Sequence, residues 1–132
     1  MAELRSAAEH GKLQVHSQDS MQAGEVLAAV AAMRGLWEEW FNAFSETSKQ
    51  RRAREIADHS FIQHAEYIEA LLSCPSRMHT GPFVSETISF VDLYLFSVVD
   101  ALRWIASTIH ETLRMQTVPN LATLLDSVAA WQ

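Results

Sequence analysis

The sequence predicts an all-α fold, a helical bundle with a buried central helix that begins at Ser89. Three observations support this prediction. The 132 residues include only three prolines and four glycines, and the β-branched residues are scattered along the chain. Large apolar residues recur every three or four positions over long stretches, which is the period of an amphipathic helix. Residues 88–93 carry the side chains that typically start a helix.

Length and composition restrict the classes of function. A chain of 132 residues predicts one domain, residues 1–132, that can bury a core without disulfides. The chain carries 16 acidic and 10 basic residues, so its surface does not favour a nucleic acid as partner. No apolar run approaches the roughly 20 residues of a membrane span. The single cysteine, Cys74, excludes an internal disulfide and, with no signal peptide in sight, indicates a reducing, cytoplasmic location.

The first third of the chain predicts two helices. Gly11 is expected to end a short helix over Met1–His10, and the polar residues 17–20 offer N-caps for a long helix over about residues 21–47. That helix carries an apolar stripe and flanking apolar residues: Val26, Val30, Met33, Trp37, Trp40 and Phe44, with Leu27, Leu36 and Phe41 beside them. The stripe is wide enough to contact more than one neighbour. It forms core, or part of it lines a pocket or a subunit contact.

A third helix is predicted over about residues 52–73. Its apolar stripe consists of Ala57, Phe61, Ala65, Ile68 and Leu72, and the acidic residues Glu55, Asp58, Glu66 and Glu69 lie mainly on the other side. The basic run KQRRAR, residues 49–54, is short and lacks interleaved aromatics, so we interpret it as a solvated helix start or loop. Cys74-Pro75-Ser76 is expected to end the helix, and Gly81-Pro82 to form a turn.

The stretch ISFVDLYLF, residues 88–96, predicts the start of the buried helix. Ser89 is the expected N-cap, and the Asp92 carboxylate can reach back to the Ser89 N–H, which makes a capping box. Ile88 and Leu93 occupy the positions of a hydrophobic staple. A buried helix start cannot use water for its first N–H groups, so these side chains must satisfy them. Removing the cap should cost roughly 0.5–2 kcal/mol.

Two further helices complete the predicted bundle. One runs from Trp104 to about Met115, either continuing the buried helix or starting anew. The last begins near Pro119, because proline suits the first turn of a helix. Its apolar face is predicted to consist of Leu121, Leu124, Leu125, Val128 and Trp131.

No residue pattern predicts catalysis or metal binding by this chain alone. Six histidines are present, but their spacing gives no HExxH motif, and the single cysteine gives no CxxC motif. Glycine-rich phosphate loops and a nucleophile elbow are absent from the sequence. Cys74 precedes a proline at a predicted helix C-terminus, where the helix dipole does not favour a thiolate. We therefore predict no catalytic residue and no metal ligand in this chain.

PFVSETISFVDLYLF, residues 82–96, resembles the capping segment of the glutathione transferases. In that family a Ser/Thr and an Asp start the buried sixth helix, and they correspond here to Ser89 and Asp92, with Ile88 as the staple residue. The flanking segments are similar to the family's long fourth helix (residues 21–44) and to its closing segment (residues 118–131). Residues 1–16 look like the tail of the linking helix. The resemblance is to the C-terminal helical domain, with a lean towards the sigma-like group.

The resemblance implies that two domains contribute different parts of the binding site. In the family, a thioredoxin-like domain binds glutathione and activates its thiol, and this chain has no βαβ pattern that would supply such a domain. Glutathione is therefore the expected cofactor only if a thioredoxin-like domain is paired with the chain. The helical domain supplies most of the hydrophobic co-substrate pocket. The residues that correspond by position are Met33, Trp37, Trp40 and Phe41.

Two functions follow from the resemblance. The first is the helical half of a glutathione transferase-like protein, a homodimer that takes an apolar electrophilic small molecule. The second is a non-enzymatic module that binds proteins with similar domains, as in translation factors and tRNA synthetase assemblies. Gly35, where many members carry an acid, and Ser85, where the family prefers glycine, depart from the transferase pattern. A third reading is a carrier of apolar compounds.

Overall fold

The computed structural model describes residues 2–73, 81–114 and 117–131 of the chain. Its helices are α1 (Ala2–Phe41), α2 (Glu46–Glu55), α3 (Phe61–Leu72), α4 (Phe90–Ile105), α5 (Ile109–Arg114) and α6 (Pro119–Trp131), and the π-helical turn η1 (Ile56–Ser60) joins α2 to α3. The described residues contain no strand. The predicted all-α fold is confirmed.

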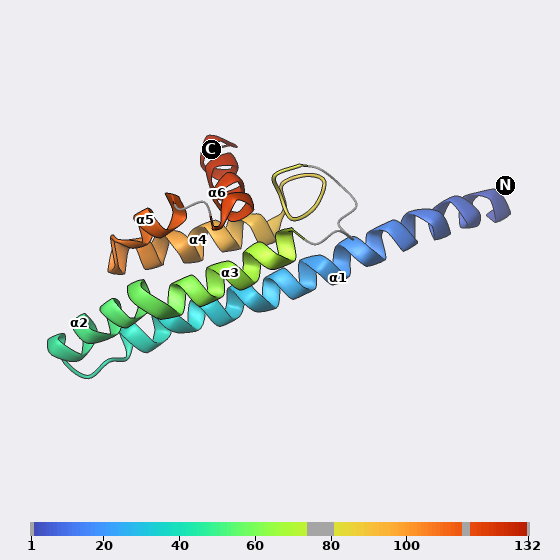
Figure 1. Cartoon of the computed structure of the whole chain (residues 1–132). Helices are drawn as coiled ribbons and strands as arrows, with labels where there is room; N and C mark the ends of the chain where they lie inside the picture. Colours follow the sequence, from blue (N-terminus) through green and yellow to red (C-terminus); the bar gives the residue numbers. More distant parts are fainter. Residues whose placement is uncertain (1, 74–80, 115–116, 132) are drawn as a thin grey trace.

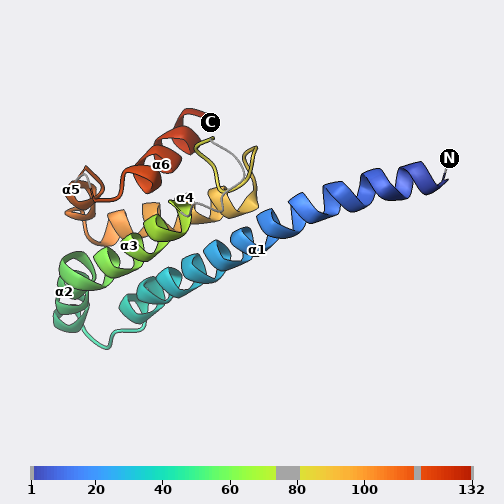
Figure 2. The ribbon, with the colours of Figure 1, turned by 45° about the vertical axis from the view of Figure 1, so that its right-hand side comes forward.

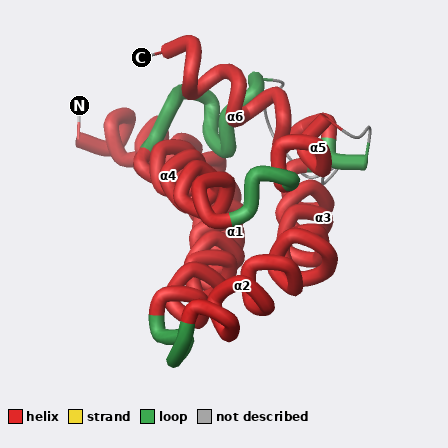
Figure 3. Tube along the Cα trace, turned by 90° about the vertical axis from the view of Figure 1, so that its left-hand side faces the viewer, coloured by secondary structure: helices red, strands yellow, loops and turns green. Residues whose placement is uncertain are grey.

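The long helix α1 organises the bundle. It packs against α3 on one side and α4 on the other, and α6 crosses to contact both α3 and α4 (Figures 1 and 2). The end view in Figure 3 shows α3 and α4 flanking α1, with α2 at the near end. The first part of α1 extends beyond the other helices.

One apolar core lies where these helices meet. Its fully buried large side chains come from every long helix and include Met33, Phe61, Ile68, Leu95, Leu102, Leu121 and Leu124. The predicted stripe of α3 is buried at Phe61, Ala65, Ile68 and Leu72. The core therefore follows the three- and four-residue spacing found in the sequence.

The predicted boundary at Gly11 is wrong, because α1 runs without interruption from Ala2 to Phe41. A glycine inside a helix costs only about 1 kcal/mol relative to alanine, which a continuous helix tolerates. The predicted end near residue 47 is also wrong. Ser45 starts α2, since its hydroxyl accepts the Ser48 N–H at 3.1 Å, and this cap separates the two helices.

The helix predicted over about residues 52–73 begins earlier than expected, because α2 starts at Glu46. The basic run consequently lies on α2, which has no buried residue, in agreement with the interpretation as a solvated segment. Arg52 pairs with Glu39 and Glu55. Helix α3 ends at Leu72, and the predicted stop at Cys74-Pro75-Ser76 lies outside the described residues.

The prediction that Glu69 faces away from the core is wrong. Glu69 is only 8% exposed, and its carboxylate receives the N–H groups of Asn120 at 3.2 Å and Leu121 at 2.9 Å, at the start of α6. The Asn120 side-chain amide and the Ser73 hydroxyl donate to the same carboxylate. Glu69 thus satisfies the free N–H groups at the N-terminus of α6 and ties that helix to α3.

Helix α4 begins at the predicted cap. Ser89 has extended backbone angles, and with Asp92 it has the geometry of a capping box. The Ser89 N–H donates to Asp92 Oδ2 at 2.8 Å, and the Ser89 hydroxyl donates to the same oxygen at 3.1 Å. Ile88 and Leu93 are partly buried against the core, as a staple requires. Helix α4 ends at Ile105, and α5 starts anew within the region predicted from Trp104 to about Met115; Met115 itself lies outside the described residues.

Two expectations about exposure are wrong. Helix α4 is not enclosed on every side, because Phe90 is 67% and Trp104 is 78% exposed. Trp131, predicted on the buried face of α6, is 61% exposed, although the four other residues of that face are buried. Ala129, Ala130 and Trp131, the last three residues of α6, are all exposed.

His64 on α3 is expected to make the stability of the domain depend on pH. It is partly buried, and this burial lowers the pKa of its imidazole below the ordinary value of 6.5. The unfolded chain therefore binds more protons between the folded-state pKa and 6.5, and stability is lost as pH falls through that window. We expect His64→Gln to reduce the decrease in urea midpoint between pH 7.5 and pH 5. The exposed His59 is the matched control, and a His59→Gln effect equal to that of His64→Gln would contradict the assignment.

Candidate functional site

An apolar cavity of about 680 Å³ lies between α1 and α4. Its lining residues are Arg34 and Trp37 from α1, and Phe90, Leu93, Tyr94, Ser97, Val98 and Ala101 from α4. A volume of this size is within the range of small-molecule sites, which are mostly apolar and carry a few polar groups. This cavity is the candidate functional site.

The sequence of α4 explains why a cavity forms there. The six lining residues of α4 are spaced 3, 1, 3, 1 and 3 apart, so they share one face of the helix. The residues that α4 buries, such as Leu95, Val99 and Leu102, share another face. The helix therefore has two apolar faces, which explains why the sequence reads as apolar nearly all round. One face packs in the core, and the other lines the cavity.

Three polar groups reach the cavity, and two of them interact across it. The Tyr94 side chain beside the Arg34 guanidinium raises the pKa of Arg34, and the nearby Glu38 carboxylate raises it further. Arg34 Nε lies 3.9 Å from Glu38 Oε1. The Ser97 hydroxyl donates to the Leu93 carbonyl at 2.9 Å, so it is bonded within its own helix. Arg34 is therefore a cation, as guanidinium groups in proteins are.

Aromatic side chains continue from the cavity to the end of α1. Phe41 stacks on Trp37 with ring centroids 5.0 Å apart and an interplanar angle of 13°. Trp40 meets Trp104 of α4 edge to face at 6.0 Å. Lys49 of α2 lies over the Trp40 ring, with its Nζ 4.9 Å from the centroid. Of these contacts, the stack of Phe41 on Trp37 is the one that packs against a wall of the cavity.

The four predicted pocket residues lie in different environments in the structure. Trp37 lines the cavity, and Phe41 supports it from outside by stacking. Met33 is 0% exposed and belongs to the core. Trp40 is half-buried beside Trp104. The role of these residues in binding a co-substrate stays a prediction.

Sequence reasoning missed the contribution of α4. The sequence pattern assigns Phe90, Leu93 and Tyr94 only to a buried helix, whereas in the structure all three line the cavity. These residues recur on a second face of α4, separate from the buried face, and that spacing could have identified them from the sequence. Arg34 does not belong to the predicted apolar stripe, yet it lines the same cavity as Trp37, which follows it by three positions.

The described residues contain no group of three or more His, Cys, Asp or Glu side chains placed to hold a metal ion. Within the same residues, no helix is both long enough and apolar enough to span a membrane. The cavity therefore has no metal centre among the described side chains, and its chemistry is that of apolar contact beside one cation.

Comparison with known proteins identifies the family. The family model described as glutathione S-transferase, C-terminal domain, matches residues 33–131. The chain belongs to this family. The match covers the end of α1, from Met33 to Phe41, and all the other helices, so it includes both sides of the cavity. No curated protein and no solved structure matches the chain.

The capping box at the start of α4 is consistent with membership of the glutathione S-transferase C-terminal domain family. The resemblance in the sequence rested on Ser89 and Asp92, and the structure places both at the start of α4. In this family member, Asp92 also accepts the Val84 N–H at 2.8 Å, so the capping residue holds the preceding loop as well as the helix.

Proposed function

We propose that this chain is the helical half of a glutathione transferase-like protein and supplies the pocket for an apolar electrophilic co-substrate. The observation that carries the proposal is the apolar cavity between α1 and α4, with Trp37 as its flat wall. Apolar walls exclude water from a reacting thiolate and hold an aromatic electrophile by contact. The sigma-like subgroup, a homodimeric state and a cytoplasmic location are parts of the same proposal.

In this scheme the chain positions the electrophile, and a thioredoxin-like domain provides glutathione and the group that activates its thiol. The described residues include no strand, so they do not contain the thioredoxin-like fold that this scheme requires. The chemistry is addition of a thiolate to the electrophile. The contribution of this half is orientation and exclusion of water.

We expect a neutral aryl halide, such as a chlorodinitrobenzene, to bind this chain in the cavity. Trp37→Ala removes the flat wall and should weaken binding about tenfold, as the loss of a buried aromatic contact does. Ala101→Leu should weaken it similarly by filling the cavity, without removing a side chain from the packing. Calorimetric titration measures both effects.

The matched control for Trp37 is Trp131→Ala, because Trp131 is 61% exposed on α6 and does not line the cavity. It should leave the affinity unchanged. Equal affinities of the parent, Trp37→Ala and Ala101→Leu chains would disprove the pocket.

We also expect this chain alone to give no glutathione-dependent turnover of the aryl halide above the uncatalysed rate. The reason is that no group in the described cavity can lower the pKa of the glutathione thiol by accepting its proton. Absorbance of the conjugate measures the rate. Turnover by the purified chain would contradict the proposed division between the two domains.

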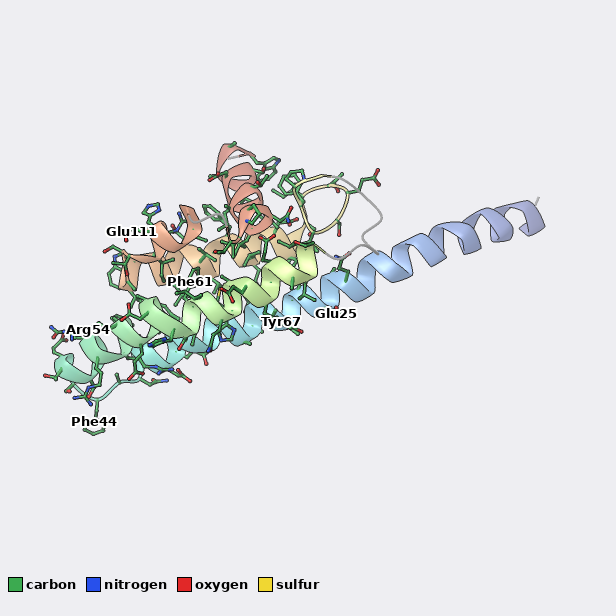
Figure 4. The ribbon with its side chains drawn as sticks, in the orientation of Figure 1. Glu25, Phe44, Arg54, Phe61, Tyr67 and Glu111 are labelled. Carbon is green, nitrogen blue, oxygen red and sulfur yellow. The ribbon has the colours of Figure 1, made fainter. Side chains whose placement is uncertain are left out.

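A second function, a module that binds similar protein domains, is favoured by the exposed aromatic end of the bundle. Phe44 is fully exposed, and Phe41 and Trp104 are 57% and 78% exposed. Figure 4 shows Phe44 pointing away from the helices at the α1–α2 connection, at the same end as Arg54. Recovery of a synthetase or translation factor on the immobilised chain, lost with Phe44→Ser and kept with Trp131→Ser, would favour this function over the first.

A further inference from the structure

We propose that a second cavity, between α4, α5 and α6, binds an apolar α-amino acid, a small zwitterion with an alkyl side chain. The volume of this cavity is about 420 Å³, near the lower end of the range of small-molecule sites. Within the described part of the chain it shares no lining residue with the cavity between α1 and α4, so the inference goes beyond the proposed function and does not depend on it. Its lining residues are Arg103, His110, Leu113, Ala122, Leu125 and Asp126.

Three helices contribute apolar and charged groups to this second cavity. Leu113 of α5 and Leu125 of α6 are buried core residues, and Ala122 lies three positions before Leu125 on α6. Arg103 of α4 and Asp126 of α6 add one charge of each sign. The cavity therefore offers an apolar wall beside a cation and an anion, which is the pattern that an apolar zwitterion matches.

Arg103 lacks a close counterion. Its side chain is only 21% exposed, and its Nε is buried without a hydrogen-bond partner among the described residues. Its pair with Asp100 joins Nη2 to Oδ1 at 4.0 Å, which is longer than a hydrogen bond, and the Asp100 side chain is 68% exposed. The guanidinium carbon also lies over the Phe96 ring, 5.9 Å from its centroid. A cation that is partly removed from water is unfavourable without a hydrogen-bonded anion, so a ligand carboxylate at the Nη atoms would supply the missing partner.

Asp126 makes a simple anion a poor ligand for this cavity. Its exposed carboxylate forms no hydrogen bond or ion pair with Arg103 or with any other described residue, so both charges remain available to a ligand. Asp126 repels the carboxylate that Arg103 attracts, unless the same ligand also carries a cation. An α-amino acid pairs with both residues, because its carboxylate and its ammonium group are attached to one carbon. His110 adds an imidazole, which can donate or accept a further hydrogen bond.

The test compares L-leucine with two analogues that each lack one charge. These are 4-methylpentanoate, which has no ammonium group, and 3-methylbutylamine, which has no carboxylate. Chemical-shift titration of this chain at pH 7 measures all three affinities and locates the ligand, which should shift the amide signals of Leu113 and Ala122. Leucine should bind at least about tenfold more tightly than either analogue, because each analogue leaves one charge of the cavity unpaired.

Two substitutions should change the preference among the three compounds. Asp126→Asn should weaken leucine binding about tenfold and strengthen the binding of 4-methylpentanoate, because it removes the repulsion of the carboxylate. Arg103→Gln should weaken leucine binding similarly and strengthen the binding of 3-methylbutylamine. Asp126 is exposed, so its substitution tests the inference even if Arg103→Gln impairs folding.

The matched control is Glu111→Gln, which removes the same charge as Asp126→Asn. Glu111 is an exposed residue of α5 and does not line the cavity (Figure 4). This substitution should leave the affinity for leucine unchanged. An analogue that binds as tightly as leucine, equal leucine affinities of the parent and Asp126→Asn chains, or the absence of any leucine-dependent shift would each overturn the inference. None of these outcomes bears on the cavity between α1 and α4.

Discussion

Replacing Asp92 with alanine is expected to lower the free energy of unfolding by about 3 kcal/mol, the largest effect of any single substitution considered for this domain. Asp92 is 0% exposed, and its carboxylate accepts the Val84 N–H and the Ser89 N–H, each at 2.8 Å. The Ser89 hydroxyl donates to it as well. Removing the carboxylate leaves buried donors without an acceptor, which adds a desolvation penalty to the loss of the helix cap.

Urea denaturation followed by circular dichroism measures this effect. Asp92→Asn keeps one carbonyl oxygen and should show a smaller loss than Asp92→Ala. The matched control is Asp100→Asn on the same helix, because the Asp100 side chain is 68% exposed and lies 4.0 Å from Arg103. Its effect should stay within about 0.5 kcal/mol. An unchanged midpoint for Asp92→Ala would show that neither the loop nor the helix start depends on this carboxylate.

Replacing Glu69 with alanine is expected to cost about 2–3 kcal/mol. The Glu69 carboxylate receives the N–H groups of Asn120 and Leu121 and the Asn120 side-chain amide at 2.6 Å. A carboxylate at this position also interacts favourably with the positive end of the α6 dipole. Because the donors come from a segment about fifty positions later in the chain, the substitution should loosen the contact between α3 and α6 specifically.

Two measurements separate this effect from a general loss of stability. Hydrogen exchange should show a greater loss of protection in the first turn of α6 than in α1. The matched control is Glu66→Ala, which changes an exposed acid one turn earlier on α3. If Glu66→Ala and Glu69→Ala lowered the urea midpoint equally, the contact with α6 would contribute nothing to stability.

Asp92 and Glu69 illustrate which interactions can be predicted from the sequence and which cannot. Asp92 acts on Ser89, three positions away, and a capping box is a local pattern that can be recognised from the residues alone. Glu69 acts on Asn120 and Leu121, and its periodicity placed it among the exposed acids of α3. The spacing of apolar residues predicts which face of a single helix is buried. It does not predict which other helix ends beside that face.

The two apolar faces of α4 illustrate the same limit for the candidate site. The sequence shows that Phe90, Leu93 and Tyr94 are apolar or aromatic, but it does not say whether a second helix covers them. In the structure α1 covers the neighbouring face and leaves this one open towards Trp37 and Arg34. Met33 and Trp37, adjacent members of one predicted stripe, consequently differ: one is enclosed in the core and the other lines the cavity.

The sequence by itself determined the all-α class, the capped start of α4 and the family, because each depends on local spacing or on residues close together in the chain. The tertiary structure decided the extent of α1, the buried role of Glu69, and the cavity with its single cation. These features depend on how helices pack. Packing places side chains from distant segments in contact, and so it decides which apolar faces are covered and which remain open to a ligand.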